Sequence, residues 1–217
     1  SLDRQQVAAF FISVVRDGTG DSGGAGLLAI DNLNAYNVIS RTVPSEKPAS
    51  VTDTVASARA AQWLAAQQQP GGLLKSWAEE RICTGHTYDQ ALALLAFARE
   101  GMWTEADALA DALARAQHAD GSWFKSYQCD DANLPCVHCY KWEGDIAWAV
   151  YALSRYLAAG GAHPQARSAM ERGAAWLVTR QAPDGCLVID HTEGTIDAWW
   201  ALQSAGPAYR KEAERLK

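Results

Sequence analysis

The sequence repeats one phrase at a nearly constant interval. In each copy, a turn with the pattern Gln-x-x-(Asp/Gly)-Gly ends one amphipathic segment, and a mostly apolar segment that opens with an aspartate follows. The aspartates are Asp89, Asp145 and Asp197, which are 56 and 52 residues apart, and a weaker first copy places Asp31 58 residues before Asp89. A period of this length is typical of one supersecondary unit per copy, stacked on its neighbours around a shared core.

The segments between the turns are predicted to be helices of two kinds. Amphipathic helices are expected on the outside, and segments that are apolar nearly all round are expected to be enclosed. We expect outer helices at 52–68, 104–117 and 164–180, inner helices at 30–41, 88–99, 145–158 and 193–204, and further helices at 1–16 and 207–217. Because no segment alternates polar and apolar residues, we expect no strand. The sequence therefore predicts an all-α fold, an α/α toroid or incomplete (α/α) barrel of repeated helical hairpins, in a single domain over 1–217.

Composition and charge exclude several partners. The chain has 217 residues, 48% of them hydrophobic, which is enough for a large core. Its formal charge is −6 and its basic residues are scattered, whereas nucleic-acid binding needs clustered Lys and Arg. No apolar run approaches the roughly 20 residues of a membrane span. We therefore expect no nucleic-acid partner and no membrane span. No signal peptide is visible, which leaves a cytoplasmic location and export with the signal removed both open.

The repeat is expected to bring acidic side chains from separate hairpins to one end of the central axis. Asp89, Asp145 and Asp197 occupy equivalent positions, and Glu143 and Glu193 lie just upstream of two of them, in predicted loops. Glycoside hydrolysis needs one carboxylic acid to protonate the leaving oxygen and a second carboxylate to activate water or attack C1. These five carboxylates are therefore candidate catalytic groups. Aspartate is also a good helix N-cap, so a repeated cap would equally explain the three aspartates.

Aromatic and histidine side chains are expected at the same rim. Trp63, Trp103 and Trp176 fall on predicted outer helices, where core packing is the simpler interpretation. Other aromatic rings fall in loops or near the starts of inner helices, where they could line a cleft or cap the core. Aromatic faces suit sugar rings and isoprenoid chains. The candidate substrate-binding residues are Tyr88, Trp77, Trp123, Trp142, Trp148, Trp199, His86 and His191.

The segment 129–139 concentrates three cysteines and a histidine. Cys129, Cys136, His138 and Cys139 could hold zinc, although their spacing does not match the usual paired Cys-x2-Cys pattern. A disulfide from Cys129 to Cys136 or to Cys139, and free thiols, are the alternatives. Cys83 could join this group in space, and five cysteines leave at least one unpaired.

Three phrases carry a resemblance to a known superfamily. The segments 87–93 (TYDQALA), 142–148 (WEGDIAW) and 193–198 (EGTIDA) follow the turns. Together they resemble the repeats of α/α-toroid proteins, most closely the bacterial six-hairpin, (α/α)6-barrel glycosidase-like proteins. More distantly, they are similar to terpenoid cyclase and prenyltransferase toroids. The resemblance implies a carbohydrate-active enzyme, a glycoside hydrolase with paired carboxylates in a Trp-lined cleft, an oligosaccharide or glycan partner and no cofactor.

Departures from these families keep other functions open. We count four helix pairs and a final helix where closed toroids have about six pairs, so the chain is an incomplete ring, a fragment or a compact variant. The Asp-x-Asp-Asp motif of terpenoid cyclases is absent. A lyase or epimerase, a zinc-dependent or isoprenoid-handling toroid enzyme with zinc on the 129–139 loop, and a non-catalytic glycan-binding or scaffold solenoid are the alternatives.

Overall fold

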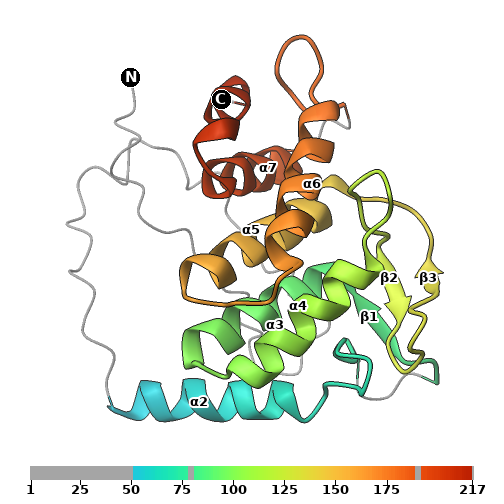
Figure 1. Cartoon of the computed structure of the whole chain (residues 1–217), viewed down its shortest axis with the longest axis vertical. Coiled ribbons are helices and arrows are strands. Elements are labelled where there is room, and N and C mark those ends of the chain that lie inside the picture. Colours follow the sequence, from blue (N-terminus) through green and yellow to red (C-terminus); the bar gives the residue numbers. More distant parts are fainter. Residues whose placement is uncertain (1–50, 78–80, 189–191, 217) are drawn as a thin grey trace, which may run out of the picture. The chain divides into compact units, whose positions relative to one another are not determined.

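The computed structural model describes residues 51–77, 81–188 and 192–216. The helices expected at 1–16 and 30–41, the first copy of the repeat and His191 lie outside the described residues, so a single domain over 1–217 stays a prediction. The described chain belongs to one compact unit. Its helices are α2 (Val51–Ala65), α3 (Thr87–Glu100), α4 (Trp103–Ala116), α5 (Glu143–Ala158), α6 (Ala166–Thr179), α7 (Thr192–Ala205), a 3-10 turn (Pro207–Tyr209) and α8 (Arg210–Arg215) (Figure 1).

The helices alternate between an inner and an outer layer, as predicted. The inner helix α5 packs between α3 and α7, while α4 and α6 lie outside them and α8 packs on α7 (Figure 1). In α4, Leu109 and Leu113 are buried and Arg115 is exposed, so only one face is apolar. In α5, most residues from Glu143 to Tyr156 are buried, because neighbours cover it on several sides. Among the described residues, no helix is both long and apolar enough to cross a membrane.

The repeated turns fasten each hairpin to the next one. In the turn 117–121, Gln117 Nε2 donates hydrogen bonds to the carbonyl oxygens of Gly121 and of Ala169 in α6, each at 2.8 Å. The other two copies make the equivalent bond to the next outer helix, Gln68 to the carbonyl of Glu105 in α4 and Gln181 to the carbonyl of Glu212 in α8. The repeated glutamine is therefore a structural residue that joins neighbouring hairpins.

The glycine that closes each turn allows this close approach, and the consequence can be measured. Gly121 has φ of 91°, and a Cβ there would lie 2.3 Å from the carbonyl oxygen of Arg172. Gly160 has φ of 107° but nothing within 4 Å of the Cβ position. We expect Gly121→Ala to lower the free energy of unfolding by about 3 kcal/mol and Gly160→Ala by about 1 kcal/mol, because only the first adds a backbone clash to the φ strain. Urea denaturation of both variants measures the difference, and equal losses would contradict it.

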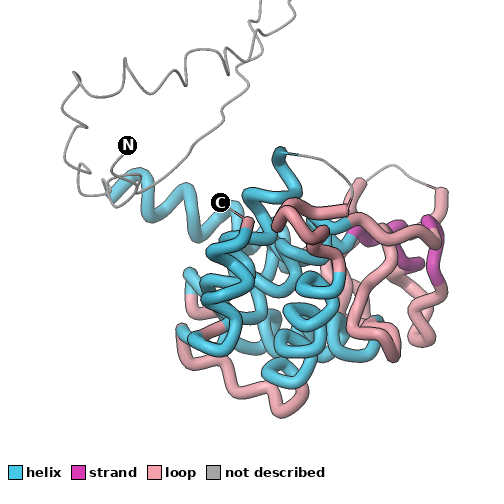
Figure 2. Tube along the Cα trace, turned by 90° about the horizontal axis from the view of Figure 1, so that it is seen from above, coloured by secondary structure: helices cyan, strands magenta, loops and turns pink. Residues whose placement is uncertain are grey.

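A small sheet lies at one side of the helices, where we expected no strand, so that prediction is wrong (Figure 2). The strands β1 (Thr84–His86), β2 (Ser126–Gln128) and β3 (Cys136–His138) are antiparallel in the order β1-β2-β3. In the register, His86 lies opposite Ser126, which lies opposite His138. Strands of three residues are too short to show an alternating pattern, which is why the sequence did not reveal them.

The disulfides differ from the pairings expected from the sequence. The structure joins Cys83 to Cys129 and Cys136 to Cys139, so a bond from Cys129 to Cys136 or Cys139 is wrong. The first disulfide links the ends of β1 and β2, where Cys129 N donates a hydrogen bond to Cys83 O at 2.8 Å. Cys186 is the unpaired fifth cysteine and is exposed.

The two disulfides should differ in how easily they are reduced. Cys83 and Cys129 are buried and 46 residues apart, whereas Cys136 and Cys139 are 3 residues apart and Cys139 is exposed. A longer closed loop stabilises more and an exposed sulfur is more easily attacked, so we expect Cys136–Cys139 to open first. Alkylation and peptide mass spectrometry at graded dithiothreitol concentrations check this order. The Cys186→Ser variant serves as the control, because it removes exchange with the free thiol, and simultaneous opening would contradict the prediction.

The tryptophans of the outer helices divide between core and surface. Trp176 is buried, as predicted. Trp63 is 61% exposed and Trp103 is 38% exposed, so core packing is wrong for Trp63 and only partial for Trp103. The predicted outer position of these helices is correct, but the charge pattern of a helix does not fix which face a single aromatic ring occupies.

Candidate functional site

Three inner helices carry the three predicted aspartates near their N-terminal ends. Asp89 is the third residue of α3 and Asp145 is the third residue of α5, while Asp197 is the sixth residue of α7. The residues at the N-caps of α3 and α5 are His86 and Trp142, and neither side chain makes a capping hydrogen bond. The N-cap interpretation is therefore wrong for Asp89 and Asp145, although both carboxylates still lie near the positive end of a helix dipole.

Asp145 is a buried carboxylate that pairs with a lysine from the sheet side. Lys125 Nζ, next to the start of β2, lies 2.9 Å from Asp145 Oδ2 and 3.2 Å from Oδ1. Burial raises the pKa of Asp145, the Lys125 ammonium opposes that rise, and the charges of Asp89 and Glu193 add to it. The net pKa is raised, and Lys125 is the group that favours the ionised form.

Asp197 is a carboxyl group that holds its proton up to near neutral pH. Burial and then the negative charge of Glu193 raise its pKa to about 7, with a further contribution from Asp145. A hydrogen bond with Trp148 acts in the opposite direction. Asp197 and Asp145 thus differ in their partners, since one faces like charge and an indole while the other faces an ammonium group.

Tyr88 lies among these carboxyl groups. Burial raises the pKa of its hydroxyl, and the charges of four carboxylates raise it further. We call these four residues the carboxylate cluster, which consists of Asp89, Asp145, Glu193 and Asp197. The Tyr88 ring packs edge-on against Trp148 with 5.6 Å between centroids. Four of the five predicted catalytic residues therefore lie close enough to one predicted substrate-binding tyrosine to raise the pKa of its hydroxyl.

Glu143 is the predicted catalytic residue that has a different partner. It is buried, and its Oε1 lies 3.0 Å from Nε of Arg180, which follows α6. It is not among the main causes of the shifted pKa of Asp145, Asp197 or Tyr88. We expected Glu143 and Glu193 in loops, but they are the first residue of α5 and the second of α7. The ion pair gives Glu143 a role in positioning the start of α5.

The predicted substrate-binding aromatic residues occupy different environments. Trp142 and Trp77 are exposed, and Trp148 and Trp199 are partly buried against the core. Trp123 is fully buried and its Nε1 donates a hydrogen bond to Leu113 O at 2.7 Å, so Trp123 is a core residue and does not line a cleft. His86 is half-buried at the end of β1.

The sequence did not single out Lys125 or Arg180. Each is an isolated basic residue near a repeated turn, and the carboxylates they pair with are 20 and 37 residues away in the sequence. Short-range spacing carries no signal for such pairs. The hairpin packing that brings α5 against the sheet side and against the end of α6 is what creates them.

The 129–139 loop does not fit a zinc site as folded here. Cys129, Cys136 and Cys139 are all in disulfides and offer no thiolate, which is the form that binds zinc. His138 Nδ1 lies 2.8 Å from Ser126 Oγ instead. In the part of the chain that the structure describes, no group of three or more His, Cys, Asp or Glu side chains is placed to hold a metal ion.

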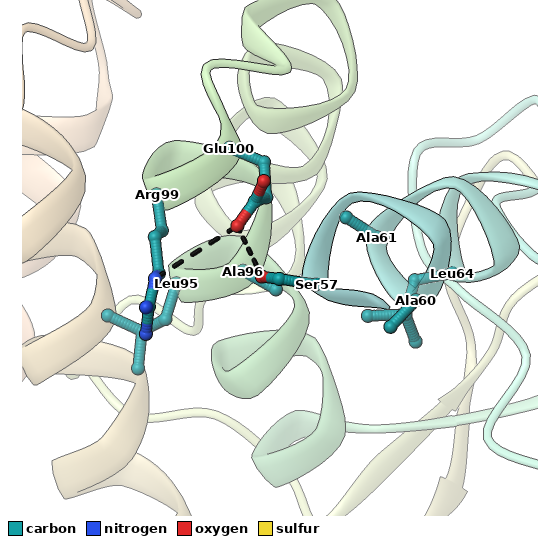
Figure 3. Close-up of a pocket in the computed structure, with 8 residues that line it drawn as sticks. All are labelled: Ser57, Ala60, Ala61, Leu64, Leu95, Ala96, Arg99 and Glu100. Atoms are coloured by element: carbon teal, nitrogen blue, oxygen red, sulfur yellow. Dashed lines mark hydrogen bonds and ion pairs between the residues drawn. The ribbon is translucent and has the colours of Figure 1, made fainter. Parts of the chain in front are cut away.

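A pocket of about 280 Å³ lies elsewhere, between α2 and α3. Its walls are mostly Ala and Leu side chains, and Glu100 interacts there with Ser57 and Arg99 (Figure 3). It contains no predicted site residue, so the carboxylate cluster remains the candidate functional site.

Comparisons with known proteins give matches of fold only. No protein-family model matches the chain, and no curated protein matches it. An unsaturated glucuronyl hydrolase specific for heparin matches with a TM-score of 0.66 and 14% identity, over 87% of this chain and 58% of its own. The unsaturated glucuronyl hydrolase from Bacillus sp. GL1, responsible for the degradation of glycosaminoglycan, matches with a TM-score of 0.57 and 15% identity, over 76% of this chain and 55% of its own.

A third solved structure extends the comparison. A possible member of the GH105 family from Salmonella enterica serovar Paratyphi A matches with a TM-score of 0.57 and 13% identity, over 74% of this chain and 51% of its own. These likenesses confirm the predicted all-α toroid of repeated hairpins and its similarity in fold to six-hairpin glycosidase-like proteins. The chain spans about half the length of the structures that it matches.

Proposed function

We propose that the carboxylate cluster is the hydrolytic site of a glycoside hydrolase that acts on an oligosaccharide. The observation that supports this proposal most strongly is the contrast between Asp197, whose pKa is about 7, and Asp145, which is paired with Lys125. Two carboxyl groups with environments that favour different protonation states are what acid and base roles require. The fold likeness to unsaturated glucuronyl hydrolases supports the same reaction class by analogy.

The two carboxyl groups receive separate roles in the proposed reaction. Asp197 donates its proton to the glycosidic oxygen as the bond from C1 to that oxygen breaks. Asp145, ionised beside Lys125, accepts the proton of the water that adds to C1. Asp89 and Glu193 supply negative charge, which keeps the pKa of Asp145 raised and favours the positive charge that develops on the sugar ring in the transition state.

The first substrates to test follow from the structural neighbours. Because two of them are unsaturated glucuronyl hydrolases, one specific for heparin, we propose oligosaccharides that end in an unsaturated glucuronyl residue. Such oligosaccharides are produced by lyase digestion of heparin and other glycosaminoglycans. Cleavage at C1 releases the unsaturated sugar, whose ring opens to a C5 enol that tautomerises to a ketone, so loss of its ultraviolet absorbance and a new reducing end both report the reaction.

The decisive experiment compares the wild type with Asp145→Asn on these oligosaccharides. We expect turnover by the wild type and a loss of about a hundredfold or more in the variant, since general base catalysis contributes about 10²–10⁴. Asp130→Asn changes an exposed loop aspartate and is the matched control. Binding without turnover by the wild type would overturn the hydrolase proposal and favour a glycan-binding module.

A further inference from the structure

Four rings, two on strands of the small sheet and two on the segments that flank it, form a continuous series that the proposed reaction does not use. The ring centroids of Trp77 and His86 are 4.6 Å apart, those of His86 and His138 are 5.6 Å apart, and those of His138 and Tyr140 are 6.4 Å apart. We call these four residues the aromatic strip. Trp77 and Tyr140 are each 50% exposed, so the two ends of the series face solvent.

The aromatic strip is held in place by the sheet. His86, Ser126 and His138 lie opposite one another across β1, β2 and β3, so their side chains share one face. Ser126 Oγ is 2.8 Å from His138 Nδ1 and also accepts a hydrogen bond from His138 N at 3.2 Å. Lys125 N donates a hydrogen bond to Tyr140 O at 2.7 Å. Exposed rings on a backbone fixed in this way mark an interaction site more often than isolated surface aromatics do.

The strip is linked to the carboxylate cluster through Lys125 and through neighbouring residues in the sequence. His86 is the N-cap of α3, which carries Asp89. Lys125, whose main chain bonds to Tyr140, extends its ammonium group to Asp145 and lies 5.5 Å from the centre of the Trp142 ring. In the sequence, Trp142 lies between Tyr140 of the strip and Asp145 of the cluster.

We propose that the aromatic strip binds the part of a glycan chain that extends beyond the bond cleaved at the carboxylate cluster. This inference rests on the proposed function, because it assumes that the cluster is the place of cleavage. Trp77 and Tyr140 offer ring faces to the C–H faces of sugar rings, while the tyrosine hydroxyl offers a hydrogen bond to a sugar hydroxyl. None of the four residues is acidic, so the strip accepts neutral or anionic sugars without charge repulsion.

The test measures how affinity depends on the length of the oligosaccharide. Size-fractionated, lyase-generated heparin oligosaccharides, from disaccharide to octasaccharide, are titrated calorimetrically into Asp145→Asn protein that carries Trp77→Ala or Tyr140→Ala. We expect each variant to weaken binding of the longer oligosaccharides about tenfold and to leave the disaccharide unaffected. Trp77→Tyr keeps a ring and should retain most of the affinity. Trp63→Ala, which removes an exposed tryptophan of α2 outside the strip, should change nothing.

The outcomes separate this inference from the proposed function. A loss that is equal for all lengths, or an equal loss in Trp63→Ala, overturns the role of the strip. Length-dependent binding that vanishes in Trp77→Ala supports the strip, even if the wild type hydrolyses none of the oligosaccharides and the hydrolase proposal fails. If the wild type hydrolyses the oligosaccharides and KM does not depend on their length, the hydrolase proposal stands and the proposed role of the strip is overturned. Circular dichroism and melting of each variant confirm that the fold is intact.

Discussion

Asp197→Asn is expected to lower turnover by about 10²–10⁴ and, at the same time, to make the protein more stable above neutral pH. The loss of turnover follows because an amide cannot donate the proton that the leaving oxygen needs. In the wild type, the acid is protonated only below its pKa of about 7. The activity of the wild type should therefore fall as the pH rises through about 7, and steady-state rates between pH 4 and 9 check this decrease.

The gain in stability follows from the same pKa. Asp197 ionises at about 7 in the folded protein but near the ordinary value of 3.8 in the unfolded chain. The folded state therefore holds the proton more tightly between these values, and the free energy of unfolding falls as the pH rises across that range. Asparagine removes this dependence. We expect a gain of about 1–2 kcal/mol at pH 8, after allowing for solvent screening of a half-buried side chain, and thermal melting at pH 4 and pH 8 measures it.

A matched control and a clear contradiction accompany this variant. Asp130→Asn makes the same chemical change at an exposed loop position and should alter neither turnover nor the pH dependence of melting. A loss of stability in Asp197→Asn at pH 8 would mean that Asp197 stabilises the helices. Unchanged turnover would mean that Asp197 does not act as the acid.

Lys125→Met is expected to shift the acidic limb of the pH–rate profile upward by about one unit and to lower the maximal rate about tenfold. The ammonium group within 3.2 Å of both carboxylate oxygens opposes the pKa rise that burial and like charges impose on Asp145. Methionine keeps the length of the side chain and removes the charge, so the pKa of Asp145 rises further. Asp145 is then ionised over a narrower pH range below the pKa of Asp197. Fewer enzyme molecules therefore have Asp145 ionised and Asp197 protonated at the same time.

Two further variants separate charge from packing at this position. Lys125→Arg keeps a cation beside Asp145 and should retain the acidic limb near its original place. Lys141→Met breaks the other lysine–aspartate pair of this region, with Asp120, and should leave the profile unchanged. An unchanged acidic limb in Lys125→Met would show that Asp145 is not the group that titrates there.

The repeated phrase predicted the layers of the fold because each copy encodes the same physical unit. The alternation of amphipathic and apolar segments identified α3, α5 and α7 as inner helices and α4 and α6 as outer ones. Periodicity reports which residues need burial, so helix starts were correct within two residues for most of these elements. The strands were not predicted, because β1, β2 and β3 depend on pairing between distant segments and on the Cys83–Cys129 disulfide, which are long-range features.

The site was predictable only as far as the repeat fixed it. Asp89, Asp145 and Asp197 follow equivalent turns, so their convergence could be inferred. Their partners could not, because Lys125 comes from an irregular segment and Glu143 turns toward Arg180 after α6. Local sequence could not distinguish an N-cap from a third helical residue either, since a shift of three positions at a helix start is within the usual uncertainty of helix ends predicted from sequence.

The glutamines of the turns make the hairpins interdependent. Gln117 and Gln181 complete their hydrogen bonds only when the following hairpin is present, because their acceptors are carbonyls of Ala169 and Glu212. A chain cut after α5 would leave Gln117 without one acceptor and would uncover the α5 surface on which α6 packs. The stability of each hairpin therefore depends on its neighbour, and removing hairpins from the C-terminal end should lower the stability of those that remain.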